Sequence, residues 1–232
     1  MIGEPSLFMQ NWCWIGLGAG IVLALIALFT DLFRCNLSVS RWYDPSWLAW
    51  LGAMDYMFHN FEEYGIDFFG RSFSFPQYMT EMSRGNLGEL SYLGCNIVLV
   101  WVLGPLLAIA ARKYKAAAPS MAVFAILNSI THVAAFPMGG YSPGLVTSLV
   151  LFIPVGLWTV YVCYVRERLG WGNFGKTLLV AAIYSFVLLQ GISLANSGTL
   201  SSDAMQGLVM LADGAICGYL WYLIGKRTAT NQ

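Results

Sequence analysis

Residues 90–111 of the 232-residue sequence read LSYLGCNIVLVWVLGPLLAIAA and contain no Asp, Glu, Lys or Arg. A helix rises about 1.5 Å per residue, so a run of this length crosses the ~30 Å hydrocarbon core of a bilayer. The whole sequence shares this character, because 58% of it is hydrophobic and only 10% is charged. A soluble domain carries about 25% charged residues. We therefore predict an all-α, polytopic membrane helix bundle.

Six further apolar runs of similar length occupy most of the remaining chain. Membrane proteins concentrate Lys and Arg in their cytoplasmic loops, and ten of the twelve basic residues fall in alternate loops between these runs. The exceptions are Arg71 and Arg84. The pattern predicts one transmembrane domain over residues 1–232, with its N-terminus outside and its C-terminus in the cytoplasm. The seven predicted spans are residues 12–33, 47–69, 90–111, 119–136, 143–165, 176–196 and 205–225.

Charge and cysteine content narrow the range of functions. Twelve basic residues are balanced by twelve acidic ones, so the sequence offers no basic surface for nucleic acid, which we exclude as a partner. The five cysteines include no C-x-x-C pair. Widely spaced cysteines in an apolar chain are typical of packing residues, and we assign them no chemistry.

The span at residues 47–69 carries more ionisable side chains than a lipid-facing helix tolerates. Each of them costs several kcal/mol in the hydrocarbon core unless it is paired, protonated or hydrated. Because a helix turns about 100° per residue, four of them share one stripe and must face the bundle interior. These four are Asp55, His59, Glu62 and Glu63.

The second of the two histidines, His132, lies in the span at residues 119–136, one helical turn after Asn128. The helical rise places His59 ~18 Å and His132 ~20 Å from the cytoplasmic ends of their spans. Asp213, in the last span, falls ~12 Å from the outer end and close to the same layer. We therefore predict a single polar cavity in the outer half of the bundle.

Three polar residues near this layer are candidate catalytic residues, but each of them could instead have a purely structural role. Asp55 and Asp213 also fit a protonated, structural aspartate. If Asp55 is functional, it is a hydrogen-bond partner that orients the His59 ring. Asn128 also fits an interhelical hydrogen-bonding pair with His132.

Residues 59–63, HNFEE, resemble the motif that names the bacterial HXXEE domain family of integral membrane proteins. The likeness extends to residues 128–132, NSITH, and to residues 141–147, YSPGLVT. It covers roughly residues 47–165. The resemblance implies a metal-binding or enzymatic protein of the bacterial inner (cytoplasmic) membrane, with its site residues among these motifs. The predicted helices outside this core are residues 12–33, 176–196 and 205–225.

Three functions follow from these residues. The first is a metal-dependent membrane enzyme, in which His59, Glu62 and His132 bind Zn or Fe and leave positions open for water, oxygen or substrate. Glu63 is then the general base or a further ligand. The second is an acid–base isomerase or terpene cyclase without a cofactor, which uses Glu62, Glu63 and Asp213. The third is a proton- or ion-coupled transporter, which the absence of an internal repeat disfavours.

We expect either enzyme to act on a hydrophobic substrate. Cavity walls of Leu, Phe, Met and Trp that open sideways between helices favour a lipid or an isoprenoid over a sugar or a nucleotide. A bound metal indicates a hydrolase for Zn or an oxidase for Fe, and catalysis without a metal indicates an isomerase or a cyclase.

Overall fold

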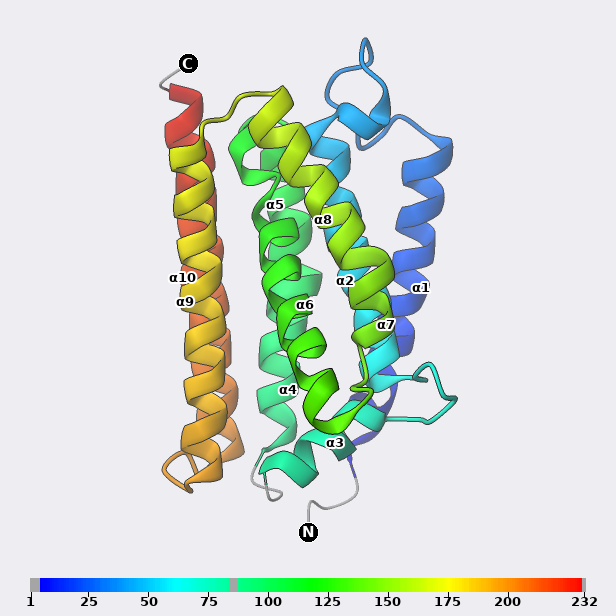
Figure 1. Cartoon of the computed structure of the whole chain (residues 1–232), viewed down its shortest axis with the longest axis vertical. Coiled ribbons are helices and arrows are strands. Elements are labelled where there is room, and N and C mark those ends of the chain that lie inside the picture. The colour runs from blue at the N-terminus through cyan, green and yellow to red at the C-terminus, as the bar shows by residue number, and fades with distance from the viewer. Residues whose placement is uncertain (1–4, 84–86, 231–232) are drawn as a thin grey trace.

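The computed structural model describes residues 5–83 and 87–230. Long helices run side by side along the longest axis of the molecule, and loops join them at both ends (Figure 1). Helix α1 (Leu7–Phe29) begins at the lower end in Figure 1, and α10 (Asp203–Thr230) ends at the upper one. The described residues contain no strand beyond an isolated bridge between Ile66 and Ser72. The all-α prediction is confirmed.

Six helices in the described part of the chain are long and apolar enough to cross a membrane. They correspond to six of the seven predicted spans and identify an integral membrane protein. In chain order they are Leu7–Phe29, Glu89–Ala111, Lys115–Pro137, Leu145–Arg166, Trp171–Asn196 and Asp203–Ala229.

The remaining predicted span, residues 47–69, forms a helix that is not among the six apolar ones. Helix α2 (Pro45–Tyr64) ends five residues earlier than predicted, and its ionisable side chains make it more polar than the other long helices. It lies inside the bundle, where all four residues of its ionisable stripe are buried. Its neighbours are α1, α5 (Gly104–Ala111), α6 (Ser120–Gly139) and α8 (Ile153–Val160).

Local chemistry sets both ends of α2. Asp44 precedes the helix and accepts hydrogen bonds from the backbone N–H groups of Ser46 and Trp47 at 2.9 and 3.3 Å. This is an N-cap, and proline at the following position is favourable because its missing N–H would have no helical partner. At the other end, a Cβ on Gly65 would lie 2.6 Å from the Phe61 ring. Only glycine fits this position, where the chain leaves the helix.

Two of the apolar spans contain a π-helical segment just before a proline. Residues 97–103 take this form before Pro105, and residues 148–152 before Pro154. Proline has no N–H to donate, so the regular hydrogen-bond ladder is interrupted at both places. The second segment follows α7 (Leu145–Thr147) directly, and α7 contacts the polar residues of α2. Such segments are frequent at functional sites.

A turn and the short helix α3 (Ser74–Ser83) cover the lower end of the bundle (Figure 1). Asp67 closes the turn, because it accepts hydrogen bonds from the backbone N–H of Phe69 at 3.0 Å and from the backbone N–H and Nε of Arg71 at 2.9 and 2.8 Å. Arg71 is therefore tied to this end. Arg84 lies outside the described residues.

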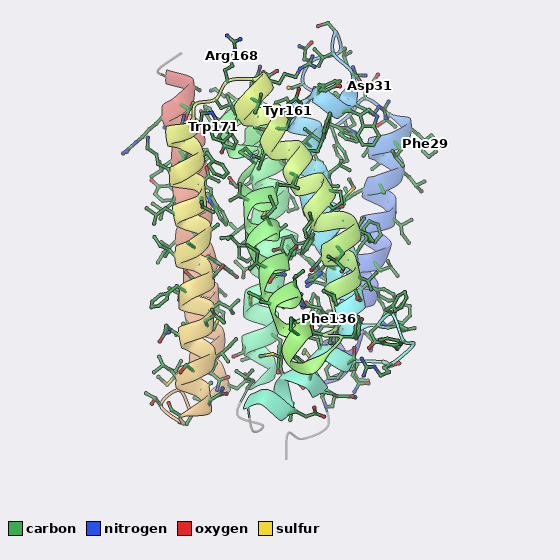
Figure 2. The ribbon with its side chains drawn as sticks, viewed as in Figure 1. Phe29, Asp31, Phe136, Tyr161, Arg168 and Trp171 are labelled. Carbon is green, nitrogen blue, oxygen red and sulfur yellow. The ribbon has the colours of Figure 1, made fainter. Side chains whose placement is uncertain are left out.

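The opposite end carries the loops that are rich in basic residues. Figure 2 places Asp31, Arg168 and Trp171 at this end and Phe136 toward the other. Ion pairs join neighbouring parts of these loops, including Lys115 with Glu167 at 2.6 Å. The basic loops therefore gather at one end of the bundle, as the placement of Lys and Arg in alternate loops of the sequence predicted.

Candidate functional site

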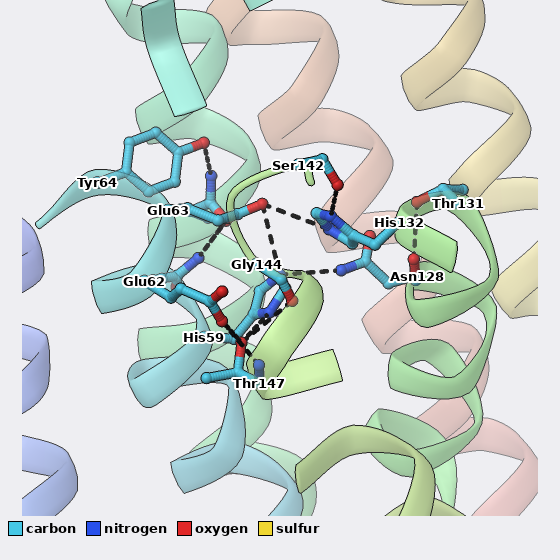
Figure 3. Close-up of polar contacts among 12 residues, drawn as sticks. His59, Glu62, Glu63, Tyr64, Asn128, Thr131, His132, Ser142, Gly144 and Thr147 are labelled. Atoms are coloured by element: carbon cyan, nitrogen blue, oxygen red, sulfur yellow. Dashed lines mark hydrogen bonds and ion pairs between the residues drawn. The ribbon is translucent and has the colours of Figure 1, made fainter. Parts of the chain in front are cut away.

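Two histidines and one glutamate meet inside the bundle (Figure 3). His59 and Glu63 lie one turn apart on α2, and His132 lies on α6. The Glu63 Oε1 atom is 3.4 Å from His59 Nε2 and 3.6 Å from His132 Nε2. One donor atom from each residue lies within 4.8 Å of the other two, and all three side chains are buried. Among the described residues this is the group of His, Cys, Asp and Glu side chains that lie close enough together to be able to hold a metal ion.

Thr147 determines which nitrogen of His59 carries the hydrogen. The Thr147 hydroxyl lies 2.5 Å from Glu62 Oε2 and 3.2 Å from the Gly144 carbonyl, and both of these oxygens accept hydrogen bonds. The single hydroxyl hydrogen goes to one of them, so Thr147 can only accept from His59 Nδ1, at 2.9 Å. His59 therefore carries a hydrogen on Nδ1, and its Nε2 atom lies 3.4 Å from Glu63 Oε1.

Asn128 contacts the same nitrogen from α6. Its Nδ2 group is a donor and lies 3.2 Å from His59 Nε2, so this hydrogen bond requires a lone pair on that nitrogen. Asn128 also borders both cavities next to the site. The structure thus brings together four of the predicted residues, His59, Glu63, Asn128 and His132.

The Glu62 carboxylate binds Tyr141 and the start of α7. Its Oε1 atom accepts hydrogen bonds from the Tyr141 hydroxyl at 2.8 Å and the Val146 backbone N–H at 3.1 Å. Its Oε2 atom accepts from the Thr147 backbone N–H at 2.7 Å and from the Thr147 hydroxyl. The carboxylate thus binds the start of the span Leu145–Arg166, where the helix dipole favours negative charge. In this arrangement Glu63, and not the predicted Glu62, is the carboxylate beside the histidines.

Tyr141 helps to hold Glu62 in this position. Burial, and to a smaller extent the neighbouring Glu62 carboxylate, raise the pKa of the Tyr141 hydroxyl above its ordinary value. The hydroxyl therefore stays protonated and donates to Glu62. On the outer side, the Arg71 guanidinium lies 5.6 Å from the centre of the Tyr141 ring, a cation–π distance.

The loop before α7 completes the site. Ser142 lies 3.2 Å from His132 Nδ1, which leaves His132 Nε2 directed at Glu63. Gly144 has φ +94°, and a Cβ there would lie 2.7 Å from His59 Cε1 and 2.8 Å from His132 Cε1. A side chain at this position cannot coexist with the two imidazoles, so both the backbone conformation and the available space require glycine.

The two predicted aspartates lie outside this group. Asp55 is buried one turn before His59, and the structure gives it no hydrogen bond to a site residue among the described ones. Asp213 accepts a hydrogen bond from Cys217 at 3.5 Å, and its other oxygen is buried with no hydrogen-bond partner among the described residues. Sequence reasoning assigned no role to Thr147 or Ser142. Both residues lie within the segment YSPGLVT, residues 141–147, and this motif was the feature of the sequence that could have identified them.

Two cavities meet at Glu63. The inner one has a volume of about 100 Å³, and tyrosines on α2 and α4 (Glu89–Asn96) line it. The second, about 280 Å³, lies between α6 and α9 (Trp171–Asn196). Exposed residues of both helices, Thr131 and Leu189, form part of its wall. The site is therefore reached from the lateral face of the bundle. The residues common to both cavities are Glu63, Phe75, Met79, Phe124, Asn128, Leu188 and Ile192.

In a comparison with protein families, residues 50–159 match a family described as a protein of unknown function with HXXEE motif. The matched segment contains the site residues of α2, α6 and α7 and excludes Asp213. No curated protein and no solved structure matches the chain. The resemblance noted in the sequence is confirmed: residues 50–159 match the model of the HXXEE family.

Proposed function

We propose that the protein is a metal-dependent membrane enzyme in which His59, Glu63 and His132 hold a Zn²⁺ or Fe²⁺ ion. Two histidines and one carboxylate suit either ion and leave positions open for water, oxygen or substrate. Metal–nitrogen bonds of about 2.1 Å in a tetrahedral site separate neighbouring ligand atoms by about 3.4 Å. The separations of 3.4 and 3.6 Å between the Glu63 oxygen and the two Nε2 atoms fit that spacing.

The convergence of lone pairs on one buried point carries this proposal. An ionised carboxylate only accepts hydrogen bonds, and a His59 Nε2 atom that accepts from the Asn128 Nδ2 group at 3.2 Å carries no hydrogen. Glu63 Oε1 and His59 Nε2 therefore face each other as two acceptors at 3.4 Å. A cation between them relieves that repulsion and neutralises a charge that is otherwise costly to bury.

The metal supplies Lewis-acid polarisation and activates water or oxygen. The residues of the chain provide its ligands and their orientation: Thr147 and Ser142 hold the two imidazole rings. Outer hydrogen bonds of this kind usually tune a metal site. The Asn128 amide borders both cavities and is placed to donate to a substrate oxygen. With Zn²⁺ bound the protein would be a hydrolase of its substrate, and with Fe²⁺ bound it would be an oxidase.

The lateral cavity supports a hydrophobic substrate. Its wall combines Phe75, Phe124 and Leu188 with the exposed Leu189 between α6 and α9. An apolar molecule can enter there from the acyl-chain region, whereas a sugar or nucleotide would lose its hydration without compensating hydrogen bonds. We therefore propose a lipid or isoprenoid-like substrate.

A metal-free isomerase or terpene cyclase is the second candidate, and the aromatic lining of the inner cavity favours it. Tyr56, Tyr64, Tyr92 and Phe124 border this cavity together with Glu63. Aromatic faces stabilise a carbocation, and a buried carboxylic acid beside them can protonate an alkene or an epoxide. No observation on the structure favours the third function, coupled transport.

The proposal also includes a membrane topology. We propose that α2 crosses the membrane as a seventh helix, shielded from lipid by its neighbours, with the N-terminus outside. The start of α1 and the end of α10 at opposite ends of the bundle support an odd number of crossings (Figure 1). The basic loops then lie in the cytoplasm. A location in the bacterial cytoplasmic membrane is part of the same proposal and rests on the sequence resemblance.

Metal content tests the proposal. We would purify the protein in detergent without added metal or chelator and measure Zn and Fe beside His59→Ala, His132→Ala and a Cys163→Ser control. We expect about one equivalent in the wild type and in the control, and loss in both histidine variants. A folded wild type that contains no metal, and takes up none when Zn²⁺ or Fe²⁺ is supplied, would support the acid–base candidate instead.

A further inference from the structure

The packed antiparallel helices α9 and α10 line a groove of about 560 Å³ at the end of the bundle opposite α3. It lies outside residues 50–159, the part of the chain that matches the HXXEE family. Leu179 and Ile183 form its wall on α9, and Leu220, Leu223 and Ile224 form its wall on α10. The groove therefore presents an apolar surface along two neighbouring helices.

Two cations stand at one end of this groove. Lys176 lies near the start of α9, Arg227 lies near the end of α10, and both side chains are exposed. The structure shows no ion pair for Lys176 with any described residue. The described lining residues include no acidic side chain. Lys176 thus places a positive charge at the end of the groove, next to Arg227.

The depth of the cations matches the membrane interface. Trp171 begins α9 and is 61% exposed at this end of the bundle (Figure 2), and exposed tryptophans favour the headgroup region. Lys176 follows five residues later, ~8 Å along the helix. From Lys176 to Ile183, and from Arg227 to Leu220, the groove extends ~10 Å toward the middle of the bundle. From the end of the bundle toward its middle, the cations come first and the apolar wall follows. A phospholipid has the same order, with its charged headgroup outside and its acyl chains inside.

We propose that this groove binds an anionic phospholipid, with the phosphate between Lys176 and Arg227 and an acyl chain along the α9–α10 wall. Charge complementarity selects the anionic headgroup, because basic pockets between transmembrane helices attract such lipids. The apolar wall selects a lipid over a free phosphate, which would leave Leu179, Ile183 and Leu220 uncovered. The site is separate from the His59–Glu63–His132 site and does not depend on its chemistry.

Lipid retention tests this proposal. The purified protein is mixed in micelles with phosphatidylglycerol and phosphatidylcholine that carry identical acyl chains, and bound lipid is counted by native mass spectrometry. We expect phosphatidylglycerol to be retained at least about fivefold better, since each interfacial cation contributes about that factor. Equal retention of the two lipids by the wild type would overturn the proposal.

Two variants distinguish lipid binding in the groove from a general attraction of anionic lipid to the positive charges at this end of the bundle. Lys176→Gln should lower retention of phosphatidylglycerol about fivefold. Lys226→Gln removes an exposed cation at the same end that does not line the groove, and should leave retention unchanged. Inorganic phosphate at 10 mM, in the same assay, should not displace the lipid. Displacement by phosphate, or equal losses in both variants, would exclude a lipid site built on Lys176.

Discussion

Glu62 and Glu63 are neighbours in the chain, yet their carboxylates serve different partners. Glu62 accepts hydrogen bonds from the backbone N–H groups of Val146 and Thr147, whereas Glu63 Oε1 lies 3.4 Å from His59 Nε2. Neighbouring helical residues point about 100° apart, so one carboxylate faces α7 and the other faces α6. Thr147 links Glu62 to the metal-binding group, because it contacts both Glu62 and His59, and His59 in turn faces Glu63.

Thr147→Val tests whether the threonine hydroxyl prepares His59. Valine keeps the shape of the side chain but cannot accept from His59 Nδ1 or donate to Glu62. We expect the metal affinity to fall about 10- to 100-fold, as is usual when a hydrogen bond to a metal-binding histidine is removed. Competition with a chelator of known affinity measures this change.

Thr159→Val is the matched control for that variant. The Thr159 hydroxyl is also buried, but it donates to the Val155 carbonyl within its own helix. It should therefore leave the metal affinity unchanged. If both variants weakened metal binding equally, the orienting role of Thr147 would be disproved.

Gly144→Ala tests how closely the loop before α7 covers the site. The new Cβ would meet the imidazole carbons of His59 and His132 at 2.7 and 2.8 Å. Gly198→Ala also places alanine at a positive φ, +78°, but with no atom within 4 Å of the new Cβ. We expect both variants to lower the melting temperature through backbone strain, and only Gly144→Ala to lose metal. Metal bound at full occupancy by folded Gly144→Ala would rule out this packing.

The turn at Asp67 predicts a pH dependence of stability. Burial alone would raise the pKa of Asp67, but hydrogen bonds from the Arg71 backbone and side chain outweigh it and lower the pKa below its ordinary value. A lowered pKa contributes stability that is complete above the unfolded value, about 3.9, and is lost as the pH falls through the folded value. The melting temperatures of wild type and Asp67→Asn should therefore differ at pH 7, and the difference should shrink only as the pH falls below about 4, toward the lowered folded pKa.

Asp31→Asn provides the comparison for that experiment. Asp31 is half exposed and pairs with Arg34 on the surface of the opposite end, and such surface pairs contribute little to stability. We expect almost the same melting temperature as the wild type at both pH values. A gap between wild type and Asp67→Asn that stayed constant as the pH fell would show that Asp67 does not titrate in this way.

Hydropathy was sufficient to predict the apolar helices. Six spans follow from composition and length, because lipid-facing helices must be apolar. The end of α2 was misplaced by five residues, since residues 65–69 are apolar enough to continue a helix. The turn there depends on Gly65 and on hydrogen bonds to Asp67, which a hydropathy pattern does not register.

Helical spacing predicted that His59 and His132 lie in one layer, and the structure directs both Nε2 atoms at one Glu63 oxygen. Spacing alone did not distinguish Glu62 from Glu63, because both fall within the interior stripe of α2. The distinction depends on where α7 packs against α2, a contact between segments more than 80 residues apart. For the same reason, the sequence did not reveal that Gly144 lies against both imidazoles.

The most direct test of the account compares the metal content of Glu63→Gln with that of Glu62→Gln. Both variants remove one charge from adjacent positions and keep the size of the side chain. After loading with Zn²⁺ and removal of excess metal, we expect wild type and Glu62→Gln to retain about one equivalent, and folded Glu63→Gln to retain less than about a tenth of it. Full occupancy in Glu63→Gln together with loss in Glu62→Gln would contradict the assignment of Glu63 as the ligand.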